Sequence, residues 1–153
     1  MMAKFARLAA AAALAVFLGA MLTEGLVLVP YWRSLPAEDF FRWYAANDQR
    51  LIGFFGPVTT TMGLLSLAAA AGSVWEGHPR RWAAVIAATL AITAIAMFFL
   101  YFEHANSTFS TASLSPTALP AELTRWATWH WTRTALAAAA VIASFRALVD
   151  PAD

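Results

Sequence analysis

The chain has 153 residues, of which 61% are hydrophobic and 12% charged, with a formal net charge of +1. This composition is too apolar for an ordinary soluble domain and predicts a membrane protein. The nearly neutral charge argues against nucleic-acid binding, and the absence of cysteine excludes disulfides, thiolate metal sites and thiol redox chemistry.

Four segments each contain the roughly 20 mostly apolar residues that a membrane-spanning helix needs. They are residues 8–32, 51–74, 82–102 and 126–145. The start of the chain imitates a secretory signal, but its apolar stretch continues to Trp32, so we expect a retained first span. The sequence therefore predicts one all-α domain over residues 1–153, an integral membrane up-and-down four-helix bundle.

The connections between these segments predict the orientation of the bundle. Basic residues near the ends of spans mark the cytoplasmic side. Those residues are Lys4, Arg7, Arg80, Arg81 and Arg146. We therefore expect both termini in the cytoplasm, with the bilayer being a bacterial inner membrane. The longer connections, residues 33–50 and 103–125, then face the other side.

Both outer connections have the composition of structured segments. In "SLPAEDFFRWYAANDQR", residues typical of a helix start precede an aromatic surface, which predicts a short interfacial helix in the first outer loop. In the second connection, Pro120 followed by Glu122 predicts the start of the helix that leads into the last span.

Polar residues of three spans occur at similar depth. At about 1.5 Å per residue, Glu24 stands roughly 26 Å above Arg7, and His130 stands roughly 24 Å above Arg146. By the same rise, Arg133 and Glu103 stand roughly 20 Å and roughly 33 Å above the cytoplasmic arginines. In a hydrocarbon core of about 30 Å, this predicts one polar layer near the outer end. Ionisable groups at such depth face the interior, pair with one another or line a site.

Two interpretations of this layer stay open. On a helix, Trp126, His130 and Arg133 share one face. Imidazole suits proton transfer near neutral pH, and a guanidinium can stabilise a substrate oxyanion. Alternatively, Glu24 and Arg133 form a structural ion pair, His130 is an interior hydrogen-bonded residue, and the tryptophans belong to an interfacial belt.

The same layer also offers potential metal ligands. Glu24, Glu103, His104 and His130 could hold a single transition metal, as carboxylate and imidazole groups do inside helix bundles. Haem ligation by His104 and His130 is less favoured. Adjacent residues diverge by about 100° on a helix, so Glu103 and His104 can face one point only if the helix ends there. The cofactor therefore stays open between none and one metal.

Four stretches of the chain resemble the anthrone oxygenase-like family of small four-helix membrane proteins. They are "TEGLVLVPYWRSLP", Asn47 with "FFGP", "YFEHANSTF" and "WATWHWTRT". The positions that match the family pattern are Pro30, Asn47, Asn106, Trp126, His130 and Arg133. The family often has a proline before its third-span asparagine, where this chain has His104. The resemblance implies an oxygenase-type pocket without flavin or haem.

These observations predict a membrane-embedded oxygenase or oxidoreductase that acts on a lipophilic small molecule near the extracytoplasmic end. We expect His130, oriented by Glu24 or Asn106, to remove a proton, and Arg133 to stabilise the resulting enolate. We expect the substrate to contact Trp126, Asn47 and Trp32. The alternatives are a metal-dependent membrane oxidoreductase and a non-catalytic binding or structural protein. The expected partners are the substrate, the lipid bilayer and, through the alanine-rich faces, a second copy of the chain.

Overall fold

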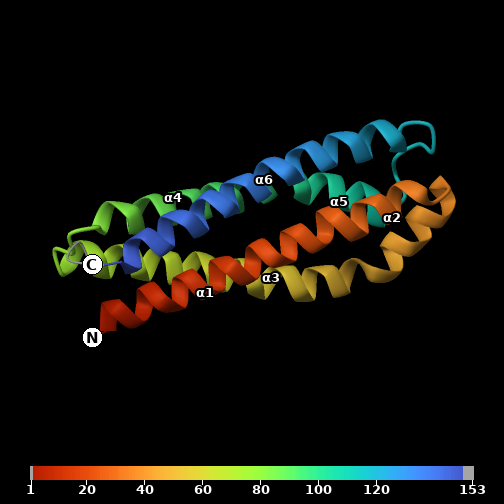
Figure 1. Cartoon of the computed structure of the whole chain (residues 1–153). Coiled ribbons are helices and arrows are strands. Elements are labelled where there is room, and N and C mark those ends of the chain that lie inside the picture. Colours follow the sequence, from red (N-terminus) through yellow and green to blue (C-terminus); the bar gives the residue numbers. More distant parts are fainter. Residues whose placement is uncertain (1, 150–153) are drawn as a thin grey trace.

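The computed structural model describes residues 2–149, which form four helical rods and no strand (Figure 1). The first rod contains α1 (Met2–Thr23), a π-helical turn η1 (Glu24–Leu28) and α2 (Val29–Ser34). The second rod is α3 (Ala37–Trp75). The third rod contains α4 (Arg81–Met97), a second π-helical turn η2 (Phe98–Phe102) and α5 (Glu103–Ser110), and the fourth is α6 (Leu119–Leu148).

The rods lie side by side in an arrangement in which each has two neighbours. α1 packs against α3 and α6, and α4 packs against the same two helices. The start of α1 and the end of α6 lie at the same end of the molecule (Figure 1). In the half that contains these ends, the core is rich in alanine, with Ala91, Ala94 and Ala140 almost fully buried. Small side chains of this kind let helices approach closely.

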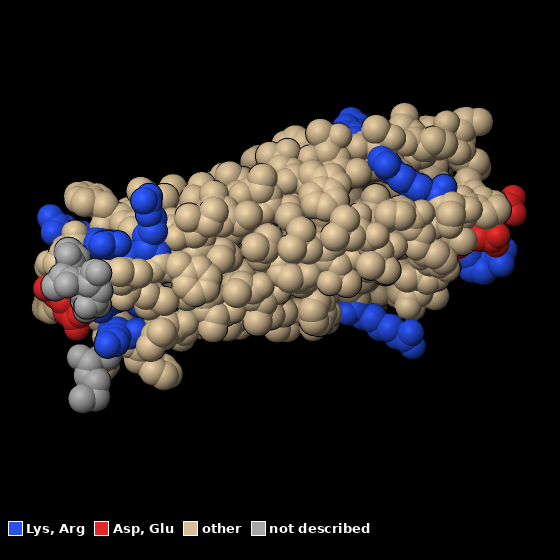
Figure 2. All heavy atoms as spheres, viewed as in Figure 1, with Lys and Arg blue, Asp and Glu red and all other residues tan. Residues whose placement is uncertain are grey.

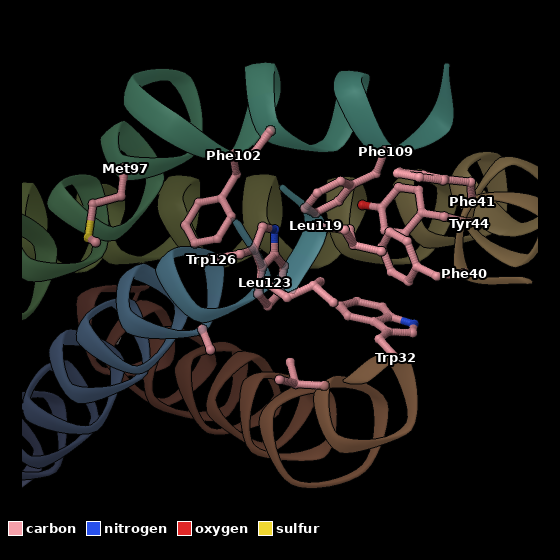
Figure 3. Close-up of a cluster of buried hydrophobic side chains, with 13 residues drawn as sticks. Trp32, Phe40, Phe41, Tyr44, Met97, Phe102, Phe109, Leu119, Leu123 and Trp126 are labelled. Carbon is pink, nitrogen blue, oxygen red and sulfur yellow. The ribbon is translucent and has the colours of Figure 1, made fainter. Parts of the chain in front are cut away.

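An aromatic core closes the opposite half of the molecule. Its largest buried rings are those of Trp32, Phe40, Phe102, Phe109 and Trp126. These rings come from all four rods and point toward one another (Figure 3). Edge-to-face contacts dominate, for example between Phe40 and Phe109, whose centroids are 5.1 Å apart. Such pairs stabilise a core beyond their burial of area, so this half is rigidly packed.

Three of the four rods are long and apolar enough to cross a membrane, by length and composition. These are the first three, Met2–Ser34, Ala37–Trp75 and Arg81–Ser110. The fourth predicted span, residues 126–145, is not among them and stays a prediction; it lies within α6, which carries Arg125, His130 and Arg133 among its 30 residues. On the face shown in Figure 2, charged side chains gather toward the two ends and the middle carries none.

The second rod differs from the predicted pair of a short interfacial helix and a separate span. α3 is one helix of 39 residues that continues through Pro57. It starts directly after Pro36 with two acidic residues in its first turn, which is favourable at a helix N-terminus. No glycine or proline then occurs before Gly53, so nothing in the sequence ends the helix where the loop was expected.

The third rod also continues beyond its predicted end at residue 102. The π-helical turn Phe98–Phe102 leads directly into α5, which ends at Ser110. Again no glycine or proline interrupts this stretch, and the first proline follows at Pro116. The predicted helix start near Pro120 is confirmed, because α6 begins at Leu119 with that proline in its first turn.

Candidate functional site

The site begins with the π-helical turn in the first rod. Glu24 is the first residue of η1, and its side chain is buried against α6. Turns of this type are rare and frequently mark functional sites. The next residue, Gly25, lies so close to α6 that a Cβ atom would come within 2.9 Å of the Trp131 ring and 3.0 Å of His130 Nε2. The glycine therefore allows the close approach that brings Glu24 to His130.

His130 is fully buried and held in one orientation. Its Nε2 lies 2.9 Å from the backbone oxygen of Met21. Because a carbonyl can only accept a hydrogen bond, Nε2 carries the hydrogen. The ring stacks on Trp126 at 5.1 Å between centroids and 10° between planes. Its second nitrogen, Nδ1, faces Glu24 at 3.4 Å from Oε2.

Arg133 completes the cluster from the next turn of α6. Its Nη2 lies 3.6 Å from Oε2 of Glu24, the same oxygen that faces His130. The guanidinium carbon lies 4.1 Å from the centroid of the Phe102 ring, a cation–π contact. The predicted sharing of one helix face by His130 and Arg133 is thus confirmed, and Glu24 reaches that face from the first rod.

Three polar atoms of this cluster have no hydrogen-bond partner in the described part of the chain. They are Oε2 of Glu24, Nδ1 of His130 and Nε of Arg133. Buried polar atoms are almost always hydrogen-bonded, so such atoms in one place mark a position that can take up a further polar group. Ionised Glu24 and the unprotonated Nδ1 of neutral His130 are both acceptors, so together they can take up one proton. The guanidinium beside them stabilises negative charge.

Asn106 supports this cluster indirectly. The sequence predicted that Glu24 or Asn106 orients His130, but Oδ1 of Asn106 accepts a hydrogen bond of 2.9 Å from Nε1 of Trp126. Trp126 in turn stacks on His130. Asn106 therefore positions the tryptophan, and the tryptophan holds the imidazole plane.

We expect Trp126→Phe to lower the free energy of unfolding by about 0.5–1.5 kcal/mol, because the indole N–H no longer bonds Asn106. The change retains an aromatic ring against His130. Trp129→Phe is the control, because Trp129 stacks on Tyr101 at 5.0 Å while its indole nitrogen has no bond in the described structure. Thermal unfolding in detergent measures both, and equal losses would contradict the assigned role.

The other predicted substrate contacts lie apart from each other. Trp32 is fully buried in the aromatic core, 5.3 Å from Trp126 between centroids, so it supports the site from behind. Asn47 lies on α3, where its amide donates to the backbone oxygen of Trp43 at 2.8 Å. Its Oδ1 accepts a hydrogen bond of 3.3 Å from Arg50.

Asn47 lines a cleft of about 290 Å³ between the first and second rods. Glu24 lines the same cleft, whereas His130 and Arg133 do not. A molecule in the cleft would therefore meet Glu24 first, with the imidazole and guanidinium behind it. The other lining residues are Ala20, Thr23, Leu28, Trp43, Arg50, Leu51, Phe54 and Phe55.

The sequence interpretation missed most of this lining. The side chains on α3 recur at helical spacing, from Trp43 through Asn47 and Arg50 to Phe54. Residues three or four apart lie on one helix face, so this pattern could have revealed the cleft. It was hidden because the residues were divided between a predicted loop helix and a separate span.

The predicted metal ligands do not come together. Glu103 and His104 are both exposed, because the third rod continues past them as α5. Glu24 and His130 are buried inside the bundle. Within residues 2–149, no group of three or more carboxylate or imidazole side chains is placed to hold a metal ion. The four predicted ligands are therefore not assembled in one place, and of the two predicted haem ligands His104 is exposed whereas His130 is fully buried.

The site thus consists of a proton-accepting pair, a neighbouring guanidinium and an apolar cleft beside the carboxylate. This arrangement can bind a small molecule, accept its proton and stabilise the anion that remains. No protein-family model, curated protein or solved structure gives a match to the chain.

Proposed function

We propose that this protein is a membrane-embedded oxidoreductase of the oxygenase type that acts on a lipophilic molecule with an acidic C–H group. The observation that carries the proposal is the contact of one buried Glu24 oxygen with both His130 and Arg133. It costs free energy to bury a carboxylate, an imidazole and a guanidinium in an apolar fold unless they pair with one another or bind a ligand. The resemblance of the motifs to anthrone oxygenase-like proteins supports the same class of reaction.

In this proposal the four rods form an up-and-down bundle in a bacterial inner membrane. Three rods are apolar enough to span, and α6 packs against α1 and α4, with its His130 and Arg133 buried. The basic residues Lys4, Arg80 and Arg146 lie near the termini and the 76–80 turn. We therefore place this end in the cytoplasm and the site toward the outer leaflet.

The proposed reaction starts with transfer of the substrate proton to the pair formed by Glu24 and His130. Glu24 lines the cleft and touches the substrate, while Nδ1 of His130 shares the proton from behind. Arg133 balances the charge of the pair and favours the anionic state of the substrate. The resulting carbanion reacts with molecular oxygen. The net change converts a CH₂ group and O₂ into a carbonyl group and water.

Oxygen uptake with anthrone as the substrate tests this function in detergent-purified protein. We expect His130→Phe and Glu24→Gln to lower the rate by about 100-fold or more, because proton transfer by a positioned group contributes at least that much. Phenylalanine can keep the stacking contact with Trp126. His104→Phe is the matched control, because His104 is exposed, and it should keep the full rate. Wild-type protein that consumes no more oxygen than detergent alone would rule the proposal out.

A further inference from the structure

The cleft between the first and second rods has the size and lining of a small-molecule site. Its volume of about 290 Å³ lies at the lower end of the range for such sites. Its walls come from the first rod at Ala20 and Glu24 and from α3 between Trp43 and Phe55. Because both rods belong to the apolar segments, the cleft would open toward lipid.

The inner wall of the cleft offers one hydrogen-bond acceptor. The side chain of Glu24 lines the cleft and is 6% exposed, while its Oε2 faces His130 and Arg133 inside the bundle. A carboxylate that lines a cleft accepts a hydrogen bond from a hydroxyl group of a bound molecule. The bound molecule therefore needs a donor at its inner end.

Another part of the wall offers the opposite chemistry. Arg50 is exposed on α3 and forms no ion pair with any described carboxylate, and its one hydrogen bond goes to Asn47. The guanidinium has five N–H donors, so most of them remain available. A carboxylate or a comparable anionic group on the bound molecule would be recognised here.

The remaining wall between these groups is apolar and aromatic. It is formed mainly by Trp43, Leu51, Phe54 and Phe55. Phe54 and Phe55 meet edge to face at 5.0 Å between centroids. Aromatic walls favour a flat ring system over a flexible chain, because rings stack or meet edge to face at little entropic cost.

We infer that the cleft binds an amphipathic aromatic acid that enters from the bilayer, with its hydroxyl group toward Glu24 and its carboxylate at Arg50. Arg50 is then the residue that selects for the anionic group. The small side chain of Ala20 leaves room in the cleft for the bound rings. This inference deepens the proposed function and rests on it for the reacting role of Glu24. The binding itself does not depend on turnover.

A fluorescence titration with 6-hydroxy-2-naphthoate tests the inference on the full chain in detergent. This probe carries a hydroxyl group and a carboxylate on opposite ends of two fused rings. We expect saturable binding to the wild type, and Arg50→Gln should weaken it by about ten-fold or more, because a hydrogen bond to a charged group is lost. Binding of 2-naphthol, which has no carboxylate, should not change.

Two further variants separate the cleft from the rest of the surface. Ala20→Phe fills the cleft and should abolish binding, whereas Ala15→Phe, on the exposed side of the same helix, should preserve it. Arg42→Gln is the matched control for Arg50→Gln, because Arg42 lies on α3 outside the cleft and contacts Asp39. Unchanged binding in Ala20→Phe, or equal weakening in Arg42→Gln and Arg50→Gln, would overturn the inference. So would complete displacement of the probe by phosphatidylglycerol, which would identify the cleft as a lipid site.

The same variants distinguish this inference from the proposed function. If Arg50-dependent binding occurs but no preparation consumes oxygen with anthrone, the inferred binding site is supported and the oxygenase proposal is ruled out. If His130→Phe abolishes oxygen uptake while Ala20→Phe leaves both uptake and probe binding intact, the proposed function is supported. The inferred binding of the aromatic acid in the cleft is then ruled out.

Discussion

Arg133→Met is expected to lower the free energy of unfolding by about 3–5 kcal/mol, the usual cost of removing one partner of a buried ion pair. The guanidinium lies 3.6 Å from Glu24 and has the Phe102 ring beneath it, so its loss leaves a buried carboxylate without its neighbouring positive charge. Methionine retains most of the length and apolar volume of the arginine stem. Denaturant unfolding in mixed micelles, followed by tryptophan fluorescence, measures the change.

The double variant Glu24→Leu/Arg133→Met separates structure from chemistry at this pair. Replacing a whole buried pair with apolar residues is often neutral or stabilising, so we expect stability to return close to that of the wild type. Oxygen uptake should stay absent, because the proton-accepting carboxylate is gone. Full oxygen uptake in the double variant would show that the pair serves only the fold.

The exposed pair formed by Arg42 and Asp39 provides the comparison. Its side chains approach to 3.3 Å but are largely in contact with solvent. Arg42→Met should therefore cost less than about 1 kcal/mol. If Arg42→Met and Arg133→Met had the same effect, burial would not govern the strength of the Glu24 contact, and the assignment of a special role to Arg133 would be wrong.

The polar site could be predicted to a large extent from helical geometry. The spacing of Trp126, His130 and Arg133 requires one shared face on any regular helix, and the height of Glu24 along the first apolar segment matches theirs. Ionisable side chains inside an apolar fold face its interior and pair with one another, because exposure to lipid is costly in free energy. For these residues the local rules and the tertiary structure agree.

The cleft lining and the positions of Glu103 and His104 could not be predicted, because they depend on where helices continue. Local sequence patterns do not determine this. Asn47 and Arg50 share a face with Phe54 only because α3 runs unbroken from Ala37 to Trp75. Glu103 and His104 lie outside because the third rod passes through a π-helical turn and goes on. Such a turn contains an extra residue, so it rotates the following residues relative to a regular helix. No residue type in the sequence predicts it.

The close approach of η1 and α6 at Gly25 could not be predicted either, since a lone glycine in an apolar helix has no distinctive pattern. Its role becomes visible only from the distances to Trp131 and His130. Glycine lowers helix propensity by about 1 kcal/mol relative to alanine, so a glycine in the middle of a span needs a tertiary reason. The contact with α6 supplies that reason.

Gly25→Ala is expected to cost about 1–3 kcal/mol in stability and most of the oxygen uptake, because overpacking of this size displaces neighbouring side chains. The new methyl group would lie 2.9 Å from the Trp131 ring and 3.0 Å from Nε2 of His130. Trp131 is 40% exposed and can swing outward, but His130 cannot move without losing its hydrogen bond to Met21.

Two comparisons isolate the contact with His130 as the cause. Gly19→Ala lies on the same helix with nothing within 4 Å of the new Cβ atom, so it should stabilise the protein by about 0.5–1 kcal/mol through helix propensity. Gly25→Ala/Trp131→Ala removes the tryptophan clash and leaves the imidazole clash. If this double variant regained full oxygen uptake, the tryptophan alone would have been the obstacle. Loss of uptake that persists there, with the fold intact, means that the function requires the position of the imidazole ring that Gly25 permits.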